Sequence, residues 1–230
     1  VAEPDEIVDV ADHILAGEGR GRVVLVTAGG TREPVDPVRF IGNRSSGKMG
    51  HAIADEASRR GYDVTLVTTS ELPSDPSVKV VRVETADEML ETVSGIDAEI
   101  AVMAAAVADF KPLSAQSAKI ARVDGLDTIE LSPTPDILAS VVARDPRPFV
   151  VGFAAETGGV ERALEKAKRK AVDLLVYNDV SEPGSGFGTD TNRVVVIDRH
   201  GNTADWPLQS KRQVAAGLWD RIGEELAGTD

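Results

Sequence analysis

The stretch Arg22-Val-Val-Leu-Val-Thr27-Ala-Gly-Gly30 decides the fold that we expect for this chain. Its uninterrupted apolar run is typical of a fully buried strand, and the two glycines that follow predict a tight loop. An amphipathic segment over 45–60 comes next; it opens with Ser45-Ser-Gly47 and stops at Gly61, which predicts a helix. A buried strand that leads through a loop into a helix is the repeating unit of an α/β sheet.

This alternation continues along most of the chain. Further strands are predicted over 62–69, 78–84, 98–104, 148–153 and 173–177, and helices over 86–93, 135–143, 160–171 and 211–226. Because parallel strands are joined by right-handed crossovers, the order indicates an α/β protein with a Rossmann-like, doubly wound, mainly parallel sheet.

Two segments depart from the alternation. Residues 193–197 and 202–207, separated by Asp198-Arg-His-Gly201, predict a C-terminal antiparallel hairpin. Residues 111–132 are too long and too polar for a plain crossover. Loops of this length inside a compact domain are usually functional, so we expect an arm that packs elsewhere.

The composition excludes several classes of protein. With 230 residues, 42% of them hydrophobic, the chain is large enough for one sizeable core. No apolar run approaches the roughly 20 residues that a membrane span needs. A net charge of −13 argues against a nucleic-acid-binding surface. The absence of cysteine excludes disulfides and thiol catalysis and favours a cytoplasmic protein, and three scattered histidines disfavour a zinc site.

The chain starts with Val1 rather than Met, and no apolar secretory region follows. We therefore expect a piece of a longer polypeptide, in which residues 1–20 are a linker and helix and residues 21–230 are a single domain.

Two glycine-containing segments are candidates for binding phosphate. Thr27-Ala-Gly-Gly-Thr31 stands where a Rossmann fold places its phosphate loop, although an ordinary tight turn explains it equally well. Arg39-Phe-Ile-Gly-Asn-Arg-Ser-Ser-Gly-Lys-Met-Gly50 brings amide, hydroxyl and amine groups to one predicted helix start, where the free N–H groups and the helix dipole attract anions. The alternative is a serine N-cap beside a solvent-exposed Lys48.

Two further candidates come from the segments that follow the third strand. Asp109, just after the strand over 98–104, is suited to hold Mg²⁺ or a ribose hydroxyl, or to cap a turn. In the polar arm, Lys119 and Arg122 are by themselves more typical of solvated charges than of ligands.

The second half of the chain offers further candidates with equally ordinary alternatives. Pro135 begins a helix and fits a plain helix start. Phe153 ends a strand and either stacks on a ring or belongs to the core. Lys166 and Lys170 lie four residues apart on one predicted helix face, which suits a polyphosphate but also an exposed face paired with Glu165 or Glu161.

The ordered set of motifs resembles the bacterial phosphopantothenate–cysteine ligases. Ala28-Gly-Gly-Thr-Arg-Glu-Pro-Val-Asp-Pro-Val-Arg-Phe-Ile-Gly-Asn-Arg-Ser-Ser-Gly-Lys-Met-Gly50 is similar to the signature of that family. Five shorter motifs follow in the family's order: Ala104-Ala-Ala-Val-Ala-Asp109, Pro135-Asp-Ile-Leu138, Gly152-Phe-Ala-Ala-Glu-Thr157, Asp173-Leu-Leu-Val-Tyr-Asn-Asp179 and Phe187-Gly-Thr-Asp190.

The resemblance implies a ligase of coenzyme A biosynthesis that acts in two steps. The carboxylate of 4'-phosphopantothenate attacks the α-phosphate of CTP and releases pyrophosphate, and the amine of L-cysteine then attacks the acyl-cytidylate, with Mg²⁺ assisting. It implies catalytic roles for Asn43 and Lys119. The residues implied for phosphopantothenate and the intermediate are Asn43, Ser45, Gly47 and Gly50. Those implied for CTP are Met103, Ala104, Ala105, Asp109, Lys119, Pro135, Asp136, Ile137, Leu138, Phe153, Lys166 and Lys170, with Asp109 also the candidate magnesium ligand.

The resemblance also implies partners. In the family the arm that carries Lys119 crosses to a second subunit, so a homodimer with shared active sites is expected. The family's Lys-Ile-Lys-Lys is Lys119-Ile-Ala-Arg122 here, which leaves the role of Arg122 open. Bacterial relatives are commonly fused behind a flavin-dependent decarboxylase, so FMN is expected only in that preceding domain.

Two other functions are compatible with parts of the sequence. An NAD(P)-dependent oxidoreductase would share the fold, but the GxGxxG fingerprint is absent. A nucleotide-sensing module without catalysis would share it too, and would not need Asn43 and Lys119 together.

Overall fold

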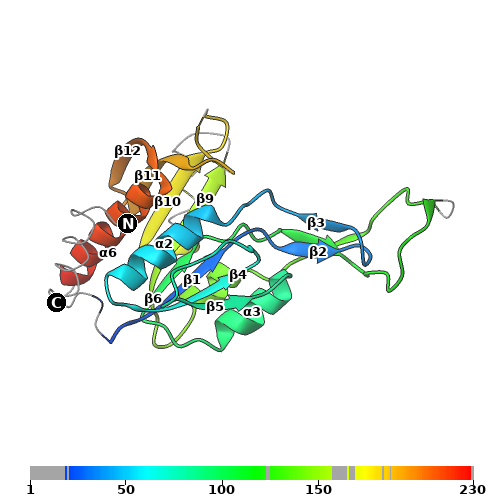
Figure 1. Ribbon diagram of the computed structural model, residues 1–230, viewed down its shortest axis with the longest axis horizontal. Helices are drawn as coiled ribbons and strands as arrows, with labels where there is room; N and C mark the ends of the chain where they lie inside the picture. The colour runs from blue at the N-terminus through cyan, green and yellow to red at the C-terminus, as the bar shows by residue number, and fades with distance from the viewer. Residues whose placement is uncertain are drawn as a thin grey trace.

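The computed structural model describes residues 19, 21–122, 125–156, 165, 169–182, 184–186 and 188–228. Within these ranges one sheet of eight strands forms the centre of the molecule, in the order β12-β11-β10-β9-β6-β1-β4-β5 (Figure 1). The strands are β1 Val23–Ala28, β4 Asp63–Thr68, β5 Lys79–Arg82, β6 Ile100–Met103, β9 Phe149–Glu156, β10 Leu174–Asp179, β11 Thr191–Asp198 and β12 Thr203–Ser210.

The parallel part of the sheet has the strand order of a Rossmann fold. Strands β5, β4, β1, β6, β9 and β10 are parallel neighbours; numbered along the chain, their order is 3-2-1-4-5-6. Strands β11 and β12 continue the sheet in antiparallel pairing. The predicted fold class and C-terminal hairpin are therefore confirmed.

Helices cover both faces of the sheet, because successive side chains of each buried strand point to opposite sides. Val24 and Val26 of β1 point to the side of the sheet that is covered by α2 (Lys48–Arg59) and α6 (Lys211–Ala227). Leu25 points to the other side, which is covered by α3 (Ala86–Ser94) and α4 (Ile137–Val142). The core on the first side includes Ile53, Leu218 and Trp219, and the core on the second includes Met89, Val93 and Val141. This double covering explains why the strands read as continuous apolar runs.

Several predicted boundaries differ from the observed ones. Strand β9 continues to Glu156 and so carries Phe153 within the strand rather than at its end. Helix α2 begins at Lys48, three residues after the predicted start, and ends one residue before the predicted end, next to Gly61 with its left-handed φ of 85°. Most of the predicted helix over 160–171, and residues 1–20 except Gly19, lie outside the described residues.

The long polar segment forms an arm that extends away from the sheet (Figure 1). Its base is the antiparallel pair β7 (Phe110–Pro112) and β8 (Leu131–Pro133). A second pair, β2 (Arg32–Pro34) and β3 (Phe40–Gly42), lies beside it and was not predicted. Large apolar side chains are exposed on these two ribbons and the arm, among them Val38 (61%), Phe40 (56%), Phe110 (53%) and Leu113 (63%).

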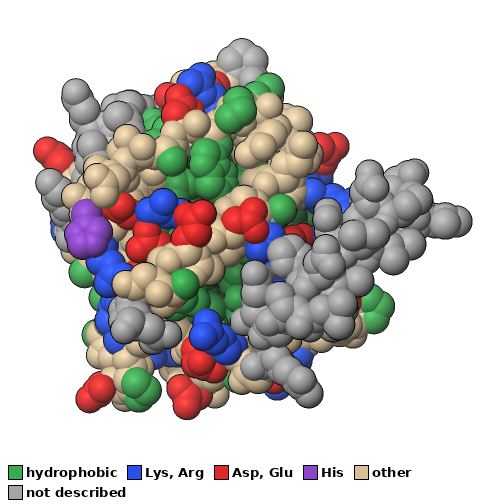
Figure 2. Space-filling view, turned by 90° about the vertical axis from the view of Figure 1, so that its left-hand side faces the viewer, with side chains coloured by type: hydrophobic (Ala, Val, Ile, Leu, Met, Phe, Trp, Pro, Cys, Tyr) green, Lys and Arg blue, Asp and Glu red, His purple; other side chains and the backbone are tan. Residues whose placement is uncertain are grey.

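Figure 2 shows the face that carries α6. In the part of this face that is not drawn in grey, acidic and basic side chains lie beside one another in the middle, with apolar side chains above and below them. None of the described helices has the length and apolarity to cross a bilayer.

Candidate functional site

The candidate site lies at the carboxyl ends of β1 and β6, where the strand order reverses and open α/β sheets bind their ligands. The two loops after these strands are joined there, since the N–H of Ala106 donates to the carbonyl of Gly29 at 2.8 Å and the N–H of Thr31 donates to Ala106 at 3.3 Å. An open cleft of about 1020 Å³ extends from this point. Its walls come from the start of α2, the segment after β6, the start of α4, and the ends of β9 and β10.

The start of α2 forms one wall of the cleft and is open to an anion. The N-cap is Gly47 in the left-handed conformation, φ 80°, and no side chain caps the helix. The hydroxyl of Ser45 accepts only a long hydrogen bond from the Gly47 N–H, at 3.4 Å. The alternative of a serine N-cap is therefore wrong, and the first N–H groups of α2 stay available to a ligand at the positive end of the helix dipole.

Gly47 cannot be replaced by a larger residue without rearrangement. A Cβ atom there would lie 2.7 Å from the Cβ atom of Ser70, in addition to the positive φ. Glycine thus lets α2 begin directly against the loop of Gly29 and Ser70.

Asn43 joins the two sides of the cleft. Its Nδ2 donates to the carbonyl of Val107 at 2.9 Å and to that of Ala106 at 3.4 Å. Asn43, Ser45 and Gly47 all line the cleft, as the proposed contacts with phosphopantothenate require.

Gly50 has a different position from the other three residues assigned to phosphopantothenate. It is buried and does not line the cleft. A Cβ atom at this position would lie 2.5 Å from the Cβ atom of Ala28 and 2.9 Å from the carbonyl oxygen of Thr27. The geometry accounts for Gly50 as the point of close contact between α2 and β1; its predicted contact with ligand stays a prediction.

The residues assigned to the nucleotide line the opposite wall of the same cleft, with two exceptions. Those in the cleft are Met103, Ala104, Ala105, Asp109, Pro135, Asp136, Ile137, Leu138, Phe153 and Lys170. Phe153 is half-buried and also packs against the core under α2 and α6, so both of its proposed environments are present.

Lys170 and Asp136 form an ion pair within this wall. Asp136 also caps α4, because its Oδ1 accepts a hydrogen bond from Ala139 N–H at 3.0 Å. Burial raises the pKa of the Asp136 carboxyl, but the bonds from Lys170 and Ala139 and the charges of Lys170 and Arg169 lower it further, so the pKa lies below its ordinary value. The predicted helix cap is therefore present, and the same carboxylate lines the cleft, where its contact with the nucleotide stays a prediction.

The two exceptions are Lys119 and Lys166. Lys119 lies on the arm and lines a separate cavity of about 640 Å³, together with Arg39 and Arg122. It is exposed and does not line the cleft of its own chain. Lys166 lies outside the described residues.

Sequence reasoning assigned no role to Lys211, a buried cation in the cleft wall. Lys211, 7% exposed, is the first residue of α6, and its Nζ donates to the carbonyls of Thr189 at 2.7 Å and Gly186 at 3.1 Å. Burial lowers the pKa of Lys211, Lys48 lowers it further, and Asp190 acts in the opposite direction. A cation in the first turn opposes the helix dipole, and this unusual placement was the signal available in the sequence.

Lys48, from the start of α2, reaches the same loop from the other side. Its Nζ donates to Asp190 Oδ1 at 2.6 Å and to the carbonyl of Gly188 at 3.0 Å. The interpretation of Lys48 as a solvent-exposed side chain beside a cap is wrong. The two lysines hold the loop between β10 and β11 against the cleft.

The predicted Mg²⁺ would depend on the acidic side chains of the cleft. Among the described residues no group of three or more His, Cys, Asp or Glu side chains is arranged around a common point. Asp109 offers one exposed carboxylate in the cleft. Mg²⁺ is usually held by one or two carboxylates together with substrate phosphates and water, so a single carboxylate fits this ion when it arrives with a nucleotide.

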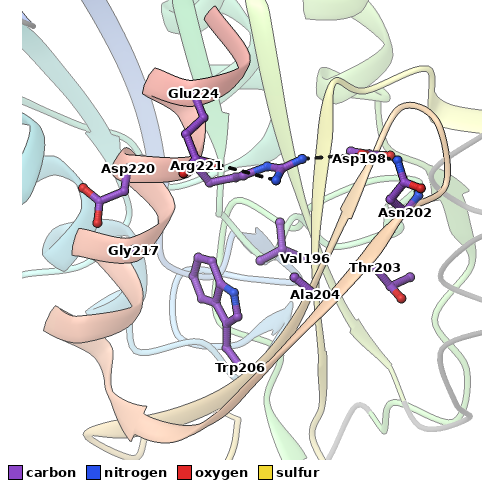
Figure 3. Close-up of a pocket in the computed structure, with 10 residues that line it drawn as sticks. All are labelled: Val196, Asp198, Asn202, Thr203, Ala204, Trp206, Gly217, Asp220, Arg221 and Glu224. Atoms are coloured by element: carbon purple, nitrogen blue, oxygen red, sulfur yellow. Dashed lines mark hydrogen bonds and ion pairs between the residues drawn. The ribbon is translucent and has the colours of Figure 1, made fainter. Parts of the chain in front are cut away.

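A smaller cavity of about 260 Å³ lies between the β11–β12 hairpin and α6 (Figure 3). Its charged lining residues are Asp198, Asp220, Glu224 and Arg221. Arg221 pairs with Asp198 at 3.5 Å and with Glu224 at 3.7 Å. Three carboxylates to one guanidinium disfavour an anionic ligand, so the larger cleft is the candidate for phosphate chemistry.

Comparisons with known proteins bear on the fold and the family of this chain. The family model described as DNA/pantothenate metabolism flavoprotein C-terminal domain matches residues 19–226. The chain is 46% identical over 248 residues to the coenzyme A biosynthesis bifunctional protein CoaBC of Mycobacterium tuberculosis (strain ATCC 25618 / H37Rv), covering 98% of this chain and 59% of that protein. It is 42% identical over 236 residues to a protein named cysteine/cysteine sulfinic acid decarboxylase, from an unknown prokaryotic organism, covering 96% of this chain and 65% of that protein. The chain thus spans less than two thirds of these relatives.

Two solved structures share the fold. The C-terminal domain of coenzyme A biosynthesis bifunctional protein CoaBC superposes with a TM-score of 0.75 at 35% identity, covering 92% of this chain and 99% of that one. The DNA/pantothenate metabolism flavoprotein from Streptococcus pneumoniae has a TM-score of 0.75 at 24% identity, covering 89% and 100% of the two chains, and bears on the fold alone. Together with the family model, the sequence relatives establish the family: this chain belongs to the DNA/pantothenate metabolism flavoprotein C-terminal domain family.

Proposed function

We propose that this chain joins L-cysteine to 4'-phosphopantothenate at the expense of CTP, giving 4'-phosphopantothenoylcysteine, CMP and pyrophosphate. In the first step a carboxylate oxygen of phosphopantothenate bonds to the α-phosphorus of CTP and the bond to the β-phosphate oxygen breaks. In the second step the cysteine amine bonds to the acyl carbon, loses a proton, and CMP leaves.

The observation that carries this proposal is that one cleft contains both an uncapped helix start and a separate wall of nucleotide-assigned residues. Gly47 begins α2 without a side-chain cap, and Asp136 and Lys170 stand in the facing wall. The reaction must bring two polyanions together, so it needs positive potential on both sides. The helix dipole supplies it on one side, and on the other Lys170 supplies it when a phosphate oxygen takes the place of its partner Asp136.

The roles of the chain's own residues follow from their positions. We assign the phosphate of phosphopantothenate to the N–H groups at the start of α2, with Ser45 and Asn43 beside it. Asn43 is fixed by its bonds to the segment after β6, which lets it orient the acyl-cytidylate for attack by the amine. Asp109 would hold Mg²⁺ in the cleft, and the ion would supply charge neutralisation on the triphosphate.

We further propose that the active unit is a homodimer in which the arm carries Lys119 into the partner's cleft. Two observations support this: the arm and its neighbouring ribbon expose Val38, Phe40, Phe110 and Leu113, and Lys119 stands apart from the cleft of its own chain. A patch of exposed apolar side chains marks a surface that another protein covers. A fused flavin-dependent decarboxylase that would hold FMN belongs to the same proposal; the bifunctional CoaBC relative, of which this chain covers 59%, supports a further domain.

The decisive experiment mixes the pure protein with phosphopantothenate, cysteine and Mg²⁺, adds either CTP or ATP, and measures pyrophosphate and CMP. We expect pyrophosphate release with CTP that requires phosphopantothenate. No release with either nucleotide would reject the ligase; reduction of NAD(P) or nucleotide binding without turnover would favour the oxidoreductase or the sensing module.

The shared site has its own test, by complementation. Lys119→Ala and Asn43→Asp chains, each impaired alone, are mixed after reversible dissociation or are co-expressed. If the arm acts in the partner's cleft, each mixed dimer contains one site with both native residues and activity returns. Mixtures as inactive as the separate variants would place Lys119 and Asn43 in the same chain's site.

A further inference from the structure

The turn between β2 and β3 is bound to the arm segment that carries Lys119. The carboxylate of Asp36 is fully buried, with a side-chain exposure of 0%. Its Oδ1 accepts hydrogen bonds from the N–H groups of Val38 and Arg39, both at 2.8 Å, which closes the turn. Its Oδ2 accepts from the N–H of Ile120 at 3.2 Å, which lies 84 residues further along the chain.

Arg39 completes a clamp on the same residue. Its Nη2 pairs with Asp36 Oδ2 at 2.9 Å and donates to the carbonyl of Ile120 at 2.5 Å. Both backbone polar groups of Ile120 are therefore bound by one ion pair. A second backbone bond, from Gln116 N–H to the carbonyl of Val35 at 2.9 Å, attaches the segment just before Lys119 to the same turn.

The clamp fixes the peptide bond that follows Lys119, because the N–H of Ile120 belongs to that bond. With the peptide plane fixed, the Cα atom of Lys119 has a defined position, and its side chain starts from one place. Arg39, Lys119 and Arg122 also line the arm cavity, so the clamp gathers three cations around one space.

The Asp36 carboxyl is ionised at neutral pH and can therefore pair with Arg39. Burial raises the pKa of the Asp36 carboxyl, but the N–H groups of Val38, Arg39 and Ile120 and the Arg39 guanidinium together keep it below its ordinary value. A turn by itself would need only the two bonds to Oδ1. The two bonds to Oδ2 serve the arm.

We propose that Asp36 and Arg39 are positioning residues that hold Lys119 for its contact with the nucleotide triphosphate. This rests on the proposed function, and it explains why an Asp-Pro-Val-Arg turn stands in the middle of the family-like signature. In this proposal Asp36 and Arg39 do not contact the substrate; they act by fixing the position of Lys119.

The test compares Arg39→Met with Lys119→Ala and with the double variant, using the full chain. We expect Arg39→Met to lower kcat/KM for CTP by roughly 10- to 100-fold, since small displacements of a binding group have effects of this size. The double variant should be no worse than Lys119→Ala alone. Arg193→Met is the matched control, because Arg193 also pairs with an aspartate, at 2.9 Å, and is similarly exposed, 46% against 43%, but lies on the C-terminal hairpin.

A second measurement does not depend on turnover. Hydrogen exchange at the amide of Ile120 should be slow in the native chain and faster in Arg39→Met and in Asp36→Asn, with no change in Arg193→Met. Unchanged exchange at Ile120 in Arg39→Met and Asp36→Asn would overturn the clamp. If the falls in kcat/KM caused by Arg39→Met and by Lys119→Ala multiply in the double variant, Arg39 does not act through Lys119. If the native chain releases no pyrophosphate, the proposed ligase function is wrong. The exchange data do not depend on that function and test the clamp alone.

Discussion

The side-chain amide of Asn43 donates to the carbonyl of Val107 at 2.9 Å, across 64 residues of sequence. This bond joins the signature segment before α2 to the segment after β6, and so joins the two walls of the cleft. An amide is suited to the position because it donates to a carbonyl, which an aspartate at neutral pH cannot do.

We therefore expect Asn43→Asp to lower kcat by roughly 10- to 100-fold, since the carboxylate would face two carbonyl oxygens and leave them without their donor. Formation of the acyl-cytidylate should suffer less than attack by the amine. Rapid quench and mass spectrometry would then show the intermediate accumulating. A fall in turnover without an intermediate would show that Asn43 serves the first step.

Gly50→Ala should destabilise the fold without a specific effect on either substrate. The new methyl group would meet Ala28 at 2.5 Å, and overpacking of this kind costs about 1–3 kcal/mol of unfolding free energy. For a chain of this size, that corresponds to a fall in Tm of roughly 2–4 °C for each kcal/mol. An unchanged Tm with a raised KM for phosphopantothenate would show instead that Gly50 contacts the ligand.

The sheet could be predicted from the sequence because buried parallel strands leave a simple mark. The apolar run before Ala28 and the one that ends at Met103 are long enough to stand out, and the turn at Gly61 marks a helix end. Strands β2 and β3 escaped because each is three residues long and their hairpin contains Pro34 and Pro37. Such short ribbons are stabilised by neighbours distant in sequence, here β7, and not by a pattern of their own.

The site divides in the same way. The helix start was predicted because it is one contiguous motif, although the start at Gly47 depends on its contact with Ser70 and could not be foreseen. The residues assigned to the nucleotide come from several short motifs, and only the family resemblance joined them. Lys211 was missed although a cation in the first turn of a helix is unusual, because its partners, the carbonyls of Gly186 and Thr189, carry no side-chain signal. A bond to a backbone carbonyl has no sequence pattern.

Two substitutions of Asp136 separate its two contacts. Asparagine is as good an N-cap as aspartate, so Asp136→Asn should keep the bond to Ala139 and lose only the charge opposite Lys170. Because that pair is partly exposed, we expect a loss below about 1 kcal/mol for Asn. Asp136→Ala should lose about 1 kcal/mol more, measured by denaturant unfolding. Equal losses for the two variants would assign the stability to the ion pair and not to the cap.

Lys211→Met should test the loop clamp by its dependence on pH. Removing the ammonium leaves the carbonyls of Gly186 and Thr189 without a donor, which costs about 1–3 kcal/mol, while it also relieves the burial of a charge. The pKa of Lys211 is lowered in the folded chain, so the native state binds fewer protons than the unfolded state between that lowered pKa and about 10.5. The stability of the native chain relative to Lys211→Met should therefore rise with pH through this window and be constant below it. Urea unfolding of both chains between pH 7 and 11 measures the difference in their free energies of unfolding. If this difference falls as the pH rises, the surroundings of Lys211 stabilise its charged form and the pKa is not lowered.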